Sequence, residues 1–213
     1  MNKSTITQET YNKSAFQYQS KFMNFNLYNE MYDAFCEAIK IKNPEIFEIA
    51  CGPGNITRYL LNKRPDFNIF GIDYSEKMIE LALQNNPSAS FKVMDCKFIC
   101  EIKKEYDGVV CGFCLPYLNK EEAVNLIADV SKLLKKEGVF YLSTMEDDYD
   151  KSGFEEPSFS EEGLIYVHYH QYDYLVNAFT DNGFAILDFQ YKNYPEKDGR
   201  ISKDMVFILK KVS

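Results

Sequence analysis

The sequence predicts an α/β fold in which helices cover both faces of a mostly parallel sheet. Between residues 45 and 144, apolar runs with strand composition alternate with segments of helical spacing. Two glycines, Gly52 and Gly54, follow the first run, at the point where a strand turns into a helix. Two further apolar runs near the end have no helix between them. Alternation of this kind implies right-handed crossovers and therefore parallel strands.

The elements can be assigned in order along the chain. Two helices are expected near 11–24 and 27–41, because aromatic and aliphatic residues recur there at spacings of three and four, and Pro44 ends this region. The central strands are expected at 45–50, 68–73, 90–94, 107–112 and 138–144, with helices near 55–63, 75–85 and 120–136.

The pattern changes after Thr144. An acidic stretch containing glycine and proline precedes a helix near 171–182, which Gly183 ends. The last two strands are expected at 184–191 and 205–211, and the polar loop between them is too short for a crossover helix. These two strands should therefore be antiparallel neighbours.

The chain is expected to form one domain over residues 1–213. The prediction is a three-layer sandwich with a mostly parallel seven-stranded sheet ending in an antiparallel strand pair. An N-terminal helical cap or lid is expected over 1–43, and a variable, substrate-facing insertion over 145–170. A chain of 213 residues with 46% apolar residues is sufficient to bury one such core.

Composition limits the class of ligand. The net charge is −8, and basic residues cluster no further than short pairs such as Lys135 and Lys136, so nucleic acid is not expected as a partner. No apolar run approaches the roughly 18 residues that cross a bilayer. The first residues lack the apolar core of a signal peptide, which predicts a cytoplasmic protein. We expect a small-molecule substrate and a monomer or homodimer.

The segment Glu48–Asn55 indicates a nucleotide-binding turn. Gly52 and Gly54 allow the backbone to approach a ligand, and Asp73 ends the second strand about 20 residues later, where a carboxylate can accept hydrogen bonds from ribose hydroxyls. A dinucleotide fingerprint would place a third glycine at position 57, which is Thr57. An adenosine cofactor is therefore expected, and an NAD(P)-binding oxidoreductase is the alternative.

At these residues the chain resembles the class I S-adenosylmethionine-dependent methyltransferases. The similar segments, in order, are 46–54, 73–78, 93–96, 106–111 and 113–118. The chain departs from the family's most common pattern at Asn55, often glycine there, and at Pro116, often histidine, which leaves the substrate class open. The resemblance implies S-adenosylmethionine as cofactor. It implies the following cofactor-binding residues: Tyr11, Tyr18, Glu48, Cys51, Gly52, Gly54, Asp73, Tyr74, Met78, Asp95, Cys96, Gly112 and Phe113.

Several of these residues have a structural alternative. Tyr11 and Tyr18 resemble a family helix that closes over the cofactor, although a bare aromatic pattern of this kind also fits a core helix. Met78 fits adenine packing or the core equally well. Asp95 is interpreted as a contact to the adenine amino group, with a plain loop acid as the alternative.

The resemblance implies methyl transfer to an O or N atom of a small molecule. The only two histidines, His168 and His170, follow the variable segment, and either could be a catalytic base. Strict alternation would place both on one face with Tyr166 and Tyr172, and the alternative is a solvated edge strand. A catalytically silent cofactor-binding protein is a further alternative.

The six cysteines are interpreted as thiols that are mostly buried. Cys111 and Cys114 have the C-x-x-C spacing of redox pairs, and with Cys96 and Cys100 they could form a zinc site. However, Cys111 ends a predicted strand, whereas a redox pair normally opens a helix. No metal is therefore expected.

Overall fold

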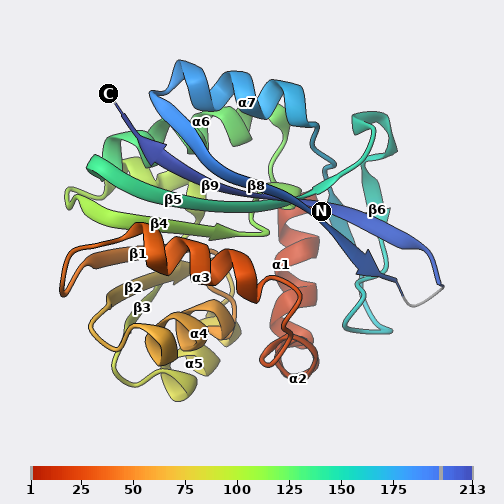
Figure 1. Ribbon diagram of the computed structural model, residues 1–213. Coiled ribbons are helices and arrows are strands. Elements are labelled where there is room, and N and C mark those ends of the chain that lie inside the picture. Colours follow the sequence, from red (N-terminus) through yellow and green to blue (C-terminus); the bar gives the residue numbers. More distant parts are fainter. Residues whose placement is uncertain (1, 197–198, 213) are drawn as a thin grey trace.

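A seven-stranded sheet forms the centre of the molecule, which a computed structural model describes for residues 2–196 and 199–212 (Figure 1). The order across the sheet is β3-β2-β1-β4-β5-β9-β8. The first five strands are parallel, and β9 is antiparallel to both β5 and β8. The strands are β1 (Glu45–Ile49), β2 (Asn68–Asp73), β3 (Ser90–Val93), β4 (Tyr106–Gly112), β5 (Leu134–Glu146), β8 (Phe184–Pro195) and β9 (Ile201–Lys211). The predicted fold class is confirmed.

Helices cover both faces of this sheet (Figure 1). The helices are α1 (Lys3–Lys13), α2 (Ala15–Phe22), α3 (Asn29–Ala38), α4 (Asn55–Lys63), α5 (Glu76–Asn85), α6 (Lys120–Leu133) and α7 (Tyr172–Asp181). Helices α3 and α4 pack on one face, and α6 and α7 pack on the other. The strand order reverses between β1 and β4, and the carboxyl ends of strands at such a point are where open α/β sheets bind ligands.

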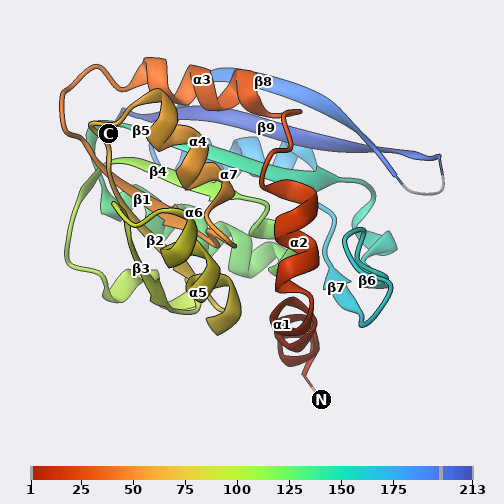
Figure 2. The ribbon, with the colours of Figure 1, turned by 90° about the horizontal axis from the view of Figure 1, so that it is seen from below.

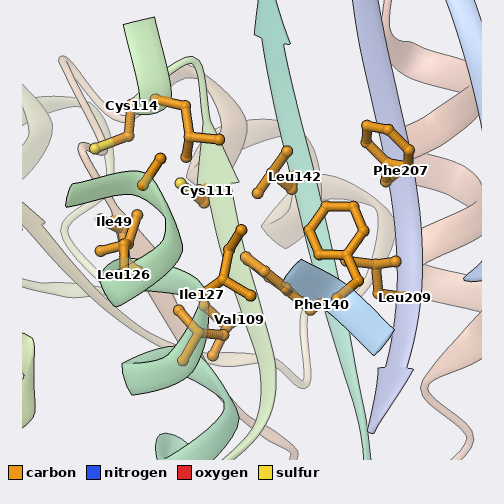
Figure 3. Packing of buried hydrophobic residues seen from close by; sticks show 14 of the residues in the cluster. Ile49, Val109, Cys111, Cys114, Leu126, Ile127, Phe140, Leu142, Phe207 and Leu209 are labelled. Carbon is orange, nitrogen blue, oxygen red and sulfur yellow. The ribbon is translucent and has the colours of Figure 1, made fainter. Parts of the chain in front are cut away.

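The core consists of two apolar clusters, one on each face of the sheet. Figure 3 shows Leu126 and Ile127 of α6 packed over Val109 of β4 and Phe140 of β5. Each such side chain contributes roughly 1.5 to 3 kcal/mol when fully buried. Among the described residues, no helix combines the length and apolar composition needed to cross a membrane.

The N-terminal region differs from the predicted single helix over 11–24. Helix α1 begins at Lys3, and the chain breaks at Ser14 before α2 begins. Tertiary contacts stabilise this polar first helix: the Thr10 hydroxyl donates to the Leu164 carbonyl at 2.8 Å, and the Ser14 hydroxyl donates to the Ser160 hydroxyl at 3.0 Å. The helical spacing of residues 3–10 is weakly amphipathic, so the sequence pattern did not indicate it.

The segment after β5 contains a small antiparallel sheet that the sequence did not predict. Its strands are β6 (Gly153–Glu155) and β7 (Ile165–Val167), and each is only three residues long. The Tyr166 amide donates to the Thr7 hydroxyl of α1 at 3.0 Å. Figure 2 shows α1 and α2 beside β6 and β7 at one end of the sheet. This insertion therefore holds the N-terminal helices over the carboxyl ends of the parallel strands.

The final hairpin is longer than predicted. Strand β8 continues to Pro195 and β9 begins at Ile201, so residues 192–195 and 201–204 of the expected loop 192–204 are strand. Residues 197–198 of that loop lie outside the described part. Pairing of Lys192 with Asp204 and of Tyr194 with Ser202 extends the ladder. Cross-strand pairing overrides the polar composition there, and it directs the side chain of Asp204 inward.

Candidate active site

The two glycines of the turn after β1 are needed for different structural reasons. Both have positive φ angles, 54° at Gly52 and 78° at Gly54, a region that glycine adopts without strain. A Cβ on Gly54 would lie 2.2 Å from the side-chain nitrogen Nδ2 of Asn86, which follows the last residue of α5. This glycine therefore allows the end of α5 to pack close to the turn. A Cβ on Gly52 would instead point toward the Tyr18 ring, 3.5 Å away. Gly52 thus keeps the floor of a cavity open.

Asp73 at the end of β2 supports this turn. One carboxylate oxygen accepts from the Gly52 amide at 2.9 Å, and the other accepts from the Ser75 amide at 2.8 Å. Burial raises the pKa of Asp73 to about 6, and these backbone donors oppose the rise. Two carboxylate oxygens offer about four lone-pair directions, so Asp73 can accept further bonds from a vicinal diol.

Glu48 does not line the cavity that its neighbours form. Its side chain is buried inside the sheet, where one oxygen accepts from the Thr57 hydroxyl and the other has no partner. Thr57 stands where a dinucleotide fingerprint has its third glycine, and its hydroxyl connects α4 to β1. Glu48 therefore stabilises the turn from behind rather than contacting a ligand directly.

The Glu48→Gln variant is expected to remove a pH-dependent loss of stability. Desolvation raises the pKa of Glu48 to about 8, so the folded protein holds this proton more tightly than the unfolded chain. Stability is then full below about pH 4.5 and falls as pH rises through 8. Because each unit of pKa shift corresponds to about 1.4 kcal/mol, the variant should be more stable than wild type by a few kcal/mol at pH 9.

Urea denaturation at pH 5.5 and pH 9 measures this difference. The exposed Glu37 of α3 offers a matched control, since Glu37→Gln removes a carboxylate from the surface. If Glu48→Gln and wild type had equal free energies of unfolding at pH 9, the prediction would be wrong. Other interactions in the folded protein would then offset the cost of burying the Glu48 carboxylate.

A cavity of about 500 Å³ lies between the strand ends, the N-terminal helices and the insertion. This volume is within the range of small-molecule sites, roughly 300 to 1,000 Å³. Of the residues expected to bind a cofactor, the following line it: Tyr11, Tyr18, Cys51, Gly52, Asp73, Tyr74, Met78, Asp95, Cys96, Gly112 and Phe113. Glu48 and Gly54 do not line it.

Aromatic rings form the wall that faces the glycine turn. The Tyr11 ring lies 5.7 Å from that of Tyr18 and 5.1 Å from that of Phe159, measured between ring centroids. The Tyr11 hydroxyl also hydrogen-bonds the Tyr117 hydroxyl. Burial raises the pKa of Tyr11 and Tyr117, so both phenols stay neutral. Tyr11 and Tyr18 therefore belong to the cavity wall, which joins helices α1 and α2 to the insertion.

Another part of the cavity lining is the acid after β3. One oxygen of Asp95 accepts from the Lys97 amide at 3.0 Å and caps the short helix η1 (Cys96–Glu101), and Asp95 and Cys96 both line the cavity. Met78 is almost fully buried yet also lines the cavity, and Tyr11 and Tyr18 pack against it. The lining therefore offers both a carboxylate acceptor for an amino group and apolar surface.

The structure separates the two histidines. His168 lines the cavity, and its buried Nδ1 has no hydrogen-bond partner within the described part of the chain. Burial lowers the pKa of its imidazole. His170 is fully buried outside the cavity, where Nδ1 bonds the Tyr174 hydroxyl and Nε2 bonds the Leu115 carbonyl at 2.7 Å. The expectation that Tyr172 shares their face is wrong, because it begins α7.

All six cysteines are free. Cys111 and Cys114 are buried, Cys96 is half-buried and Cys100 is exposed. Among the described residues, no three His, Cys, Asp or Glu side chains gather as they would around a metal ion.

The lining residues fit S-adenosylmethionine. Gly52 leaves room where a Cβ would narrow the cavity, and Asp73 has acceptor capacity left for ribose hydroxyls. The free oxygen of Asp95 suits the adenine amino group, and Met78 supplies an apolar surface for the ring.

Some cavity residues were not singled out from the sequence. Tyr28 and Asp204 lie 176 residues apart, and their side chains meet in the cavity through a 2.7 Å hydrogen bond. Phe159 comes from the insertion, where no motif indicated it. The only signal in the sequence was the position of Asp204 at the start of an apolar run.

Comparisons with known proteins agree with this site. Residues 46–138 match a family model described as a methyltransferase domain. The chain is 37% identical over 100 residues to "Putative methyltransferase 235L" of Invertebrate iridescent virus 6, covering 46% of this chain and 37% of that protein. It is 25% identical over 120 residues to demethylmenaquinone methyltransferase of Thermotoga maritima, covering 56% of this chain and 52% of that protein. The chain thus spans about a third to a half of the length of these relatives.

Among solved structures, magnesium protoporphyrin IX methyltransferase from Synechocystis PCC 6803 with bound S-adenosylmethionine superposes with a TM-score of 0.73. The two chains are 17% identical, and the match covers 99% of this chain and 98% of that one, so it establishes the fold. With the glycine turn, Asp73 and the strand order, these matches lead to one conclusion. Residues 46–138 match a methyltransferase domain, and the chain as a whole has the fold of the S-adenosylmethionine-dependent methyltransferases.

Proposed function

We propose that the protein transfers a methyl group from S-adenosylmethionine to an O or N atom of a small-molecule acceptor. One observation carries the proposal: a single cavity is lined both by the cofactor motifs and by residues of α1, α2 and the insertion. A cofactor and an acceptor can therefore share one enclosed space, which direct methyl transfer requires.

The cofactor supplies an electrophilic methyl group on a sulfonium. What remains for the chain is to align an acceptor about 3 Å from that carbon and to exclude water. Asp73 and Asp95 would fix the two ends of the adenosine, and Gly52 would leave room for the remainder. The rings of Tyr11, Tyr18 and Phe159 would shield the reacting atoms from solvent.

His168 is the candidate base within this cavity. Its amide donates to the Pro116 carbonyl at 2.7 Å, and its ring stacks on Tyr149 at 5.8 Å, so both backbone and ring are held in place. The lowered pKa keeps the imidazole neutral at pH 7, the form that can accept a proton. His170 is not part of the proposal because both of its ring nitrogens are occupied.

The setting of the reaction is part of the same proposal. Six free cysteines support a reducing, cytoplasmic location. The net charge of −8 supports a small molecule rather than nucleic acid as the partner. We further propose that the protein acts as a monomer or homodimer.

Calorimetric titration tests the cofactor, and S-adenosylhomocysteine release tests the reaction. S-adenosylmethionine and S-adenosylhomocysteine are expected to bind, whereas NADH and NADPH are not, because Thr57 replaces the third glycine of a dinucleotide site. Tight nicotinamide binding without sulfonium binding would favour an oxidoreductase instead. Cofactor binding without S-adenosylhomocysteine release from any acceptor in a broad amine and hydroxyl panel would favour a catalytically silent protein.

A further inference from the structure

Asp204 is a buried carboxylate that faces the cavity. It lies on β9, opposite Met145 of β5 and Lys192 of β8, and its residue is 3% exposed. Val206 and Ile208 follow it at strand alternation and pack beneath α3. An apolar stripe of the core thus ends in a carboxylate at the cavity wall, where an apolar residue would be less costly to bury.

Within the described part of the chain, Asp204 has one hydrogen-bond partner and no ion pair. The partner is the Tyr28 hydroxyl, which donates at 2.7 Å. The lysines on either side are engaged elsewhere: Lys192 pairs with Glu30 at 2.9 Å, and Lys203 pairs with Glu146 at 2.6 Å. Glu196, a second acid in the cavity lining, adds to the negative field.

Among the residues that the structure describes, no lysine or arginine pairs with Asp204. Desolvation and the charge of Glu196 raise the pKa of Asp204 to about 7, while the Tyr28 hydrogen bond opposes the rise. Half-buried Lys21, whose ammonium lies 5.4 Å from the Tyr194 ring centroid, donates to the Ser158 carbonyl and does not line the cavity. A buried carboxylate is strongly stabilised by a paired cation, and here the open side of Asp204 faces ligand space.

Aromatic rings surround the same part of the cavity. The Tyr28 ring lies 5.1 Å from Phe113 and 5.8 Å from Phe25, and Phe25 lies 5.7 Å from Tyr194. All four residues line the cavity. Phe113 directly follows β4, so this group adjoins the cofactor motifs. Ring faces attract a cation within about 6 Å, which adds to the attraction of the carboxylate.

The Asp204 group is distinct from the His168 end. The charged neighbours of His168 are Lys3, Lys97 and Glu122, and Lys97 follows directly on the proposed adenine contacts. The charged and phenolic neighbours of Asp204 are Tyr28, Tyr141 and Glu196. The two groups share no partner, so the cavity offers an acidic aromatic part beyond its adenine end.

We infer that Asp204 and the rings of Phe25, Tyr28 and Tyr194 bind a cationic amino group of the acceptor. The acceptor class is then a small amine with an apolar body, rather than a carboxylic acid or a neutral alcohol. This inference rests on the proposed function, since it names the substrate class of the same cavity. A merely structural Asp204 would not distinguish an amine from its neutral analogue.

Calorimetry at pH 8 with saturating S-adenosylhomocysteine tests the inference. The probes are benzylamine, 2-phenylethylamine and 3-phenylpropylamine, each compared with the corresponding alcohol. At least one amine is expected to bind tenfold or more tightly than its alcohol. Asp204→Asn, which can still accept the Tyr28 hydrogen bond, should remove this preference and leave alcohol binding within twofold.

Two variants control for indirect effects. Glu146→Gln removes a carboxylate from the neighbouring strand outside the cavity and should retain the amine preference. Tyr28→Phe keeps the carboxylate and should also retain it, and a thermal melt of each variant confirms folding.

Three outcomes would overturn the inference. They are equal binding of every amine and its alcohol, an unchanged preference in Asp204→Asn, or a tenfold loss of S-adenosylhomocysteine affinity in that variant. The last would assign Asp204 to the cofactor's own amino group. Failure of the proposed function gives a different result, because wild type would then bind no S-adenosylhomocysteine. In that case the amine and alcohol titrations would be carried out on the protein without S-adenosylhomocysteine.

Discussion

Replacing Asp73 with alanine is expected to weaken S-adenosylmethionine binding by roughly 10- to 150-fold, the effect of losing hydrogen bonds to a charged group worth about 1.5 to 3 kcal/mol. The reason is that the carboxylate holds the turn through the Gly52 amide and, in the proposed site, would also accept from the ribose hydroxyls. Wild-type affinity should also fall below about pH 6, where Asp73 gains a proton and loses acceptor capacity. Titration calorimetry from pH 5 to pH 8 measures both effects.

The same variant should also lower the melting temperature of the cofactor-free protein. Both carboxylate oxygens hold backbone amides, and removing them leaves two donors without a partner. Asp66→Ala is the matched control. Asp66 is an aspartate in the turn before β2, but it pairs with Arg64 and does not line the cavity. Cofactor affinity of Asp73→Ala within twofold of wild type would place the ribose elsewhere.

Replacing His168 with asparagine is expected to lower turnover by roughly 10²-fold while cofactor affinity stays unchanged, which is the lower end of general-base contributions. Its buried Nδ1 has no partner among the described residues, so the ring has unused hydrogen-bonding capacity at the cavity. Because burial lowers the pKa of His168, wild-type turnover should be level above pH 7 and fall on the acidic side.

The measurement uses whichever acceptor releases S-adenosylhomocysteine in the panel, with kcat and KM determined separately from pH 6 to pH 9. A base predicts a fall in kcat and loss of the acidic limb of the pH profile. A positioning role predicts a rise in KM with kcat retained. Full activity of His168→Asn across this range would remove the histidine from the mechanism.

The sequence pattern was sufficient for the order of the central strands and for the turn after β1. Helix α4 and strand β2 have the predicted bounds, and Gly52 and Gly54 lie in the predicted turn between β1 and α4. These features are local: strand composition, helical spacing and a glycine with positive φ depend on residues close in sequence. Ordered motifs at strand ends then meet in space because parallel strands place their carboxyl ends on one edge.

The acceptor half depends on contacts between residues far apart in the chain. Tyr28 and Asp204 meet across 176 positions, and Ser14 and Ser160 across 146. The polar composition around Asp204 indicated a loop, and hairpin pairing made it a strand with an inward carboxylate. His168 and His170 differ by two positions, yet one lines the cavity and the other is buried, since burial follows from the packing of the insertion and α7. No local periodicity encodes such packing, so the sequence patterns predicted the turn and the strand ends, whereas only the tertiary contacts brought the rest of the cavity lining together.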